Sequence, residues 1–166
     1  MNRILTIDPS GTSTTGLFYF ENWSKYQIFS FTSENWLEQA KNLANLVKKE
    51  KIEIIACETS SMWKKTGYTF HFDKLIKLVG YCEYLAQELG VKYVPVSNSY
   101  LGRWEREAKE GKIKGLLMKE EKGKKGRSKH VWYFKEQELN EHEKDALLIF
   151  YVYWCKFLKK EWPFSN

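Results

Sequence analysis

The chain has 166 residues, of which 43% are hydrophobic, 16% aromatic and 29% charged. That length suits one compact domain, residues 1–166, and excludes a large two-domain enzyme. No run of about 18 apolar residues could span a bilayer, and the first residues lead into a strand-like pattern instead of a secretory signal. A cytoplasmic protein without membrane contact is therefore expected. The three cysteines are an odd number within apolar segments, which predicts reduced core residues and neither a disulfide framework nor a zinc site.

The formal net charge of +6 comes from one stretch of the chain. Residues 103–129 hold 11 lysines and arginines but five glutamates, and the remainder is neutral. Localised cations gain free energy by releasing phosphate counterions, so this stretch indicates a docking surface for a polyanion. A solvated Lys/Glu helix followed by a flexible loop explains the same composition equally well.

The first half of the chain predicts three strands, a helix and a fourth strand. Runs of β-branched and aromatic residues at 3–7, 15–20 and 26–31 indicate strands joined as a meander. Apolar residues then recur at helical spacing from Ser33, which can cap the helix, to residue 51. The apolar run 52–57 predicts a buried strand, and Glu58 stands at its carboxyl end.

The second half predicts a helix over 72–89, a strand over 91–96 and a helix from Ser97 to about residue 109. The Gly- and Lys-rich residues 111–126 indicate a mobile loop, followed by a short helix over 128–135. Residues 141–158 are apolar almost all round, which predicts a buried helix. The order βββαβαβαα is typical of an α/β fold with a five-stranded mixed sheet and helices on both faces.

Four polar side chains are predicted to meet at one edge of this sheet. Asp8 and Glu58 each follow an apolar strand, where open α/β sheets place their ligands. His142 and Asp145 are spaced i, i+3 and share one face of the last helix. Apolar residues continue that face, so it should point inward, where a charge is costly without a compensating partner.

Three carboxylates and an imidazole can hold Mg²⁺ or Mn²⁺. Two such ions can activate a water and stabilise the leaving oxygen at a phosphodiester. Each residue alone has a simpler explanation: Asp8 as a turn residue, Glu58 as an exposed strand end, and His142 and Asp145 as polar residues of a helix terminus. Their joint occurrence in this element order favours the metal centre.

Several short motifs occur in an order that resembles the RuvC family of Holliday junction resolvases, within the RNase H-like superfamily. They extend over nearly the whole chain and are Ile7-Asp8-Pro9, Thr15-Gly16, Ala56-Cys57-Glu58, Gly126-Arg127-Ser128-Lys129 and His142-Glu143-Lys144-Asp145-Ala146. The resemblance implies an RNase H-like fold and a homodimeric endonuclease. Such an enzyme binds four-way DNA junctions and makes symmetric nicks with divalent metal, leaving a 5′-phosphate and a 3′-hydroxyl.

By the same resemblance, Asp8, Glu58 and Asp145 match the metal-binding carboxylates of the family. His142 stands where most RuvC proteins have an aspartate, and an imidazole can bind metal or carry a proton. As a softer ligand it could favour Mn²⁺ over Mg²⁺. Lys129 resembles a lysine that these proteins keep near the scissile phosphate, where it could stabilise developing charge.

Two groups of residues are candidates for DNA contact. Trp63, Lys64 and Lys65 follow Glu58 closely, and an exposed tryptophan there could wedge against a distorted base step while the lysines hold phosphate. Packing of Trp63 onto the core is the alternative. The family match places a cationic patch beside the active site, comprising Lys122, Lys124, Lys125, Arg127 and Lys129, and loosely matches Arg103 to another basic residue.

Three other functions remain open at this stage. The same fold could act on RNA or on an RNA–DNA hybrid, or it could be a catalytically idle DNA-binding module. Residues 8–14 also resemble the first phosphate loop of actin-like sugar kinases, although those enzymes close two such domains over ATP. The sequence favours the metal-dependent junction endonuclease over all three.

Overall fold

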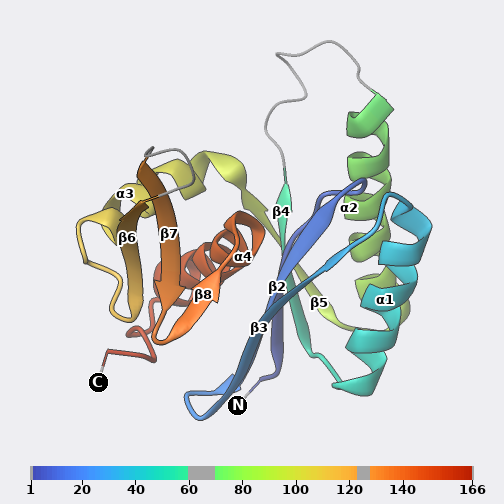
Figure 1. The fold of residues 1–166 in the computed structure, drawn as a ribbon. Coiled ribbons are helices and arrows are strands. Elements are labelled where there is room, and N and C mark those ends of the chain that lie inside the picture. The colour runs from blue at the N-terminus through green and yellow to red at the C-terminus, as the bar shows by residue number, and fades with distance from the viewer. Residues whose placement is uncertain (1, 60–69, 123–127, 166) are drawn as a thin grey trace.

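The computed structural model describes residues 2–59, 70–122 and 128–165. Its larger sheet has the strand order β3-β2-β1-β4-β5 (Figure 1). The first three strands pair antiparallel, and β4 and β5 run parallel to β1. The predicted five-stranded mixed sheet is confirmed. Its strands are β1 (Ile4–Asp8), β2 (Thr14–Asn22), β3 (Lys25–Thr32), β4 (Ile54–Thr59) and β5 (Lys92–Ser97).

Helices cover both faces of this sheet, as predicted. α1 (Trp36–Lys49) and α2 (Phe70–Glu88) lie on one face, and α4 (Glu141–Tyr151) lies on the other (Figure 1). Side chains alternate along a strand, so β1 contributes to two cores. Leu5 and Ile7 pack with the helices α1 and α2, whereas Ile4 packs with α4. α4 continues into a π-helical turn over Val152–Phe157, so the long buried helix is confirmed.

The remaining helical segment begins at a side-chain cap. Ser97 accepts a hydrogen bond from the backbone N–H of Ser99 and starts a 3₁₀ turn, Asn98–Tyr100, which leads into α3 (Leu101–Lys109). The residue that caps α1 differs from the predicted Ser33. Asn35 caps it through Leu37 N, and Ser33 instead accepts a bond from Asn35 N at 3.0 Å.

A second sheet was not predicted. β6 (Leu116–Lys122), β7 (Ser128–Phe134) and β8 (Gln137–Leu139) form three antiparallel strands beside α4 (Figure 1). The expectation of a loop over 111–126 is wrong for residues 116–122, and the expected short helix over 128–135 is a strand. The complete element order therefore carries three strands between α3 and α4 that βββαβαβαα lacks.

Residues along β6 and β7 alternate with the period of two of a strand, but the many charged residues of this segment hide that alternation in the sequence. Leu116, Trp132 and Phe134 are buried against the core around α4, so the sheet is anchored by only a few apolar residues. Beyond them the strands are exposed and pair opposite charges, with Glu121 directly across from Lys129. Such cross-strand pairs stabilise a hairpin whose composition is that of a loop.

Among the described helices, none combines the length and the hydropathy that a membrane span requires.

Candidate active site

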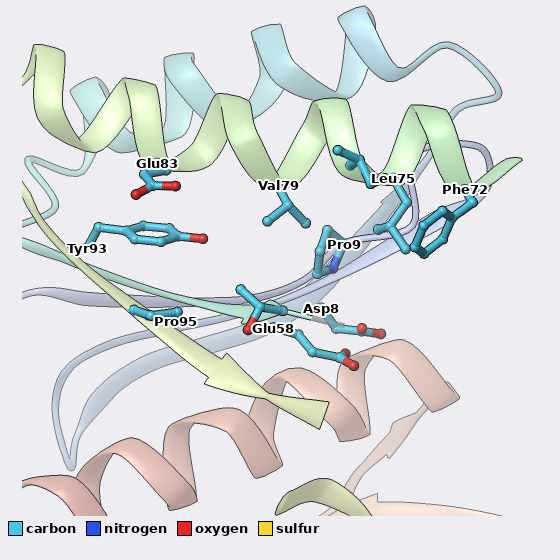
Figure 2. Close-up of a pocket in the computed structure, with 11 residues that line it drawn as sticks. Asp8, Pro9, Glu58, Phe72, Leu75, Val79, Glu83, Tyr93 and Pro95 are labelled. Carbon is cyan, nitrogen blue, oxygen red and sulfur yellow. The ribbon is translucent and has the colours of Figure 1, made fainter. Parts of the chain in front are cut away.

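Strand pairing brings the first two carboxylates together. β1 and β4 are parallel with Ile7 opposite Cys57, so Asp8 and Glu58 are neighbours at the carboxyl end of the two strands. Their side chains share a hydrogen bond. Figure 2 shows the two carboxylates side by side and pointing in the same direction. The predicted meeting of these residues at one sheet edge is confirmed.

The amino terminus of α4 brings the other two residues to the same place. His142 Nδ1 lies 2.6 Å from Asp8 Oδ2, across 134 positions of the chain. Asp145, one helical turn later, raises the pKa of Glu58 through its negative charge, which places it in the same electrostatic cluster. The four predicted ligands therefore lie together, from β1, β4 and α4.

Two local contacts fix α4 against the sheet. The hydroxyl of Thr6 donates a 2.6 Å hydrogen bond to the carbonyl oxygen of Ala146, in the first turns of the helix. Gly16 pairs with Asp8 in the sheet, and a Cβ added to it would lie 2.0 Å from the carbonyl oxygen of His142. The glycine of the Thr15-Gly16 motif thus permits the close approach that joins His142 to Asp8.

Burial and mutual repulsion perturb the protonation of the cluster. Burial, the hydrogen bond to Asp8 and the nearby negative charges raise the pKa of Glu58 to about 9. Burial likewise raises the pKa of Asp145 to about 6, although Lys144 opposes the rise. The hydrogen bond to Asp8 raises the pKa of His142, against the effect of burial. The strongly raised pKa of Glu58 indicates that these carboxylates repel one another at the carboxyl edge of the sheet.

Lys144 is a member of this site that the sequence reasoning missed. Its side chain is 4% exposed, with Nζ lying 3.2 Å from Asp145 Oδ1 and 2.6 Å from Glu141 Oε2. Burial would lower the pKa of this amine, but the surrounding carboxylates, Asp145 foremost, raise it overall. A lysine on the inward side of an otherwise apolar helix was the available signal.

The donor set suits a hard divalent cation by its chemistry. Three carboxylates and one imidazole are ligands that Mg²⁺ and Mn²⁺ accept, and three close carboxylates need compensating positive charge. The donors are bonded to one another instead of surrounding a common centre. Accordingly, no three histidine, cysteine, aspartate or glutamate side chains within residues 2–59, 70–122 and 128–165 are arranged so that they could hold a metal ion. Binding a metal would require side-chain rotations that replace the hydrogen bonds among Asp8, Glu58 and His142.

The predicted DNA contacts lie partly within the described chain. Lys129 is exposed on β7 and lines a surface pocket together with Glu141 and Glu143 of the first turn of α4. Arg103 is exposed on α3, 3.7 Å from Glu107 and above the ring of Trp104. Six further predictions lie outside the described residues: Trp63, Lys64, Lys65, Lys124, Lys125 and Arg127.

A pocket of about 340 Å³ adjoins the carboxylates and was also missed. It lies between α2 and the strands β4 and β5, with Asp8 and Glu58 among its lining residues (Figure 2). Leu75 and Val79 line it and are only half-buried, whereas Leu78 on the same helix is fully buried. Helical spacing groups all three on one apolar face of α2, and spacing alone does not show where the packed core ends.

Comparisons with known proteins identify the fold. No family model matches the sequence, and no curated protein matches it. Among solved structures, RuvC from T. thermophilus in complex with a Holliday junction substrate matches over 90% of both chains, with 14% identity and a TM-score of 0.54.

Two further solved structures match at lower TM-scores. YeaZ from Pseudomonas aeruginosa has a TM-score of 0.43 with 13% identity, covering 86% of this chain and 62% of that one. Fowlpox virus resolvase in complex with Holliday junction DNA has a TM-score of 0.37 with 11% identity, covering 57% of this chain and 60% of that one. The likeness to the Thermus protein extends over nine tenths of both chains. The chain has a RuvC-like fold of the RNase H-like class.

Proposed function

We propose that this chain is a metal-dependent, structure-selective DNA endonuclease that resolves four-way Holliday junctions by symmetric nicks. One observation carries the proposal. Asp8, Glu58, His142 and Asp145 meet at the carboxyl edge of the sheet from three separate elements, within a fold like that of a RuvC protein bound to a junction. Burying carboxylates close together costs folding free energy. Clusters of this kind are typical of functional sites.

Each member of the cluster has a proposed role. Asp8, Glu58 and Asp145 would hold two Mg²⁺ or Mn²⁺ ions, which would supply positive charge at the phosphodiester and make a water nucleophilic. His142, bonded to Asp8, is the fourth ligand or carries the proton that the attacking water loses. Hydrolysis would leave a 5′-phosphate and a 3′-hydroxyl. Lys129, exposed on strand β7, would contact a DNA phosphate.

Symmetric nicking requires two active sites, so we propose a homodimer. The outer face of α2 supports this part of the proposal. Tyr84 is 58% exposed there, and its ring lies 6.4 Å from that of Tyr81. Exposed aromatic residues on a helix between charged neighbours suit a second copy of the chain.

Cleavage of a synthetic four-way junction with Mg²⁺ or Mn²⁺, beside linear duplex of the same sequence, tests the proposed function. Asp8→Asn and Asp145→Asn should each lower the cleavage rate by at least about 100-fold while junction binding persists, because each removes a metal ligand and relieves repulsion. Glu136→Gln, an exposed carboxylate on the turn between β7 and β8, is the matched control and should cut normally.

Cutting by either aspartate variant at the wild-type rate would refute the assignment of the site. Equal cutting of linear duplex would refute the selectivity for branched DNA. Faster cutting of RNA or of an RNA–DNA hybrid than of the junction would transfer the same site to a different substrate.

A further inference from the structure

The pocket beside the carboxylates is largely apolar along its length. Phe72, Leu75 and Val79 of α2 form one wall, and Pro95 of β5 lies on the opposite side (Figure 2). Its volume of about 340 Å³ is enough for a planar ring system the size of a purine. Because Asp8 and Glu58 line one end, a molecule in the pocket would be continuous with one at the active site.

The pocket also contains an unexplained polar group. The hydroxyl of Tyr93 is buried, has the thiol of Cys57 as its weak hydrogen-bond partner and no oxygen or nitrogen partner among the described residues, and points along the pocket toward Val79 (Figure 2). Burial raises the pKa of this hydroxyl well above its usual range, so it remains a donor. A buried hydroxyl whose only partner is a thiol costs folding free energy, because a thiol is a weak acceptor, and a ligand that accepts from this hydroxyl can remove the cost.

A second polar group lies near the Tyr93 hydroxyl. Glu83 lines the same end of the pocket from α2, and its carboxylate is exposed at the rim. It acts on Tyr93 electrostatically, as do the buried thiols of Cys57 and Cys82. One end of the pocket thus offers a hydroxyl donor and a carboxylate acceptor, and the other end offers the cluster proposed to hold metal.

We propose that this pocket receives one unstacked nucleobase of the DNA strand whose phosphate lies at Asp8 and Glu58, and that it favours guanine. The inference rests on the proposed function and adds base selectivity to it. Enzymes that read an unstacked base stack it between apolar or aromatic side chains and hydrogen bond its pairing edge. Bases at a branch point are the least costly to unstack, since their pairing is already strained.

The span of the pocket matches one nucleotide. Glu58 pairs with Val96 in the sheet, and Tyr93 lies three residues earlier on β5, which is about 10 Å along the strand. That separation is comparable to the distance from the phosphate of a nucleotide to the outer edge of its base. A single nucleotide can therefore join the two ends of the pocket.

The polar groups select guanine among the four bases. Its pairing edge presents two adjacent N–H donors, which a carboxylate such as Glu83 can accept together. Its O6 is an acceptor for the Tyr93 hydroxyl. Thymine has one N–H donor, and cytosine and adenine each present one amino group, so each leaves part of this pair unused.

Binding of single nucleotides tests the pocket without requiring cleavage. The four deoxynucleoside monophosphates, as 3′- and 5′-phosphates, are titrated with Mg²⁺ and observed by NMR, with 2-deoxyribose 5-phosphate as the ligand without a base. We expect dGMP to bind at least fivefold more tightly than dTMP and at least tenfold more tightly than the sugar phosphate. Equal affinity for all of these ligands would overturn the inference.

Three variants examine the contacts. Tyr93→Phe should reduce the advantage of dGMP at least threefold with little change in stability, because the hydroxyl loses only a weak bond to the thiol of Cys57. Glu83→Gln should reduce the same advantage, since an amide offers one acceptor. Val79→Trp fills the pocket and should abolish base-dependent binding. Lys41→Trp, on the exposed side of α1, is the control and should bind as the wild type does. An unchanged advantage of dGMP in Tyr93→Phe would overturn the assigned hydroxyl contact.

A junction with randomised bases around the branch point links the pocket to cleavage. Sequencing of the cut ends should show a guanine preference at one position next to the cut, and Tyr93→Phe should weaken it there alone. Junction cutting without any base preference would overturn the inference and leave the proposed function standing. Selective dGMP binding with no cutting of any DNA would support the base pocket and overturn the proposed function.

Discussion

The bond between His142 and Asp8 depends on one small residue. His142 belongs to α4 and Asp8 to β1, and their ring nitrogen and carboxylate oxygen are 2.6 Å apart. The two elements approach so closely because Gly16, opposite Asp8 in the sheet, has no side chain. The chemistry of the site is therefore sensitive to a position that carries no functional group.

Gly16→Ala should separate α4 from the sheet. The added methyl group would lie 2.0 Å from the carbonyl oxygen of His142, a backbone atom that moves only with the helix. We expect a loss of about 3 kcal/mol in the free energy of unfolding by urea, and a cleavage rate lowered at least about tenfold. Gly80→Ala, where a new Cβ meets nothing within 4 Å, is the control. Wild-type stability in Gly16→Ala would contradict the packing described here.

At the scale of elements, α4 contacts the larger sheet, α3 and the second sheet. Lys144 reaches Glu105 of α3 at 3.5 Å, and its Nζ lies 5.6 Å from the ring centroid of Trp132 in β7. The same amine contacts Asp145, so the position of one carboxylate depends on α3 and on the second sheet. Much of the basic stretch on α3 is neutralised locally, as in the pairs Arg103–Glu107 and Lys109–Glu105. That result supports the solvated-helix interpretation for part of this stretch.

Lys144→Met should show how far α4 relies on this amine. The variant keeps the length of the side chain but leaves the carboxylates of Asp145 and Glu141 without their cation. We expect a loss of about 2 kcal/mol in the free energy of unfolding. Lys144→Arg keeps the charge and should lose less, and Lys41→Met, on the exposed side of α1, should change little. Equal stability of the methionine and wild-type proteins would show that the amine only balances surface charge.

For the whole molecule, the main consequence of the site is repulsion between carboxylates at one edge of the sheet, which the imidazole of His142 offsets only at Asp8. Asp8, Glu58 and Asp145 come from β1, β4 and α4, and the only amine with a contact to them among the described residues is that of Lys144, at Asp145. The cluster therefore opposes the folded state, which a cation that binds there would stabilise.

Divalent metal should raise the melting temperature of the protein, and more so at higher pH. The pKa of Glu58 is raised to about 9, so at pH 6 a proton must leave before its carboxylate can bind metal, whereas at pH 9 about half of these groups are already ionised. Calorimetry at a Mg²⁺ concentration 100-fold above its Kd should show a gain of about 5 °C. Asp145→Asn should lose most of this gain, and Glu136→Gln should keep it. A gain that falls as pH rises would contradict the assignment.

The sequence alone determined the five-stranded mixed sheet, the helices on its two faces and the meeting of four polar residues at one edge of the sheet. These features follow from local periodicity and from polar residues at the ends of apolar runs. Both signals lie within short continuous segments of the sequence. The tertiary structure decided the second sheet, the role of Lys144 and the pocket under α2. The strands β6 and β7 are held by cross-strand charge pairs and a few buried residues, so their composition resembles a loop. Lys144 and the pocket depend on which elements face each other across the core, and that choice is made by packing between segments far apart in the chain.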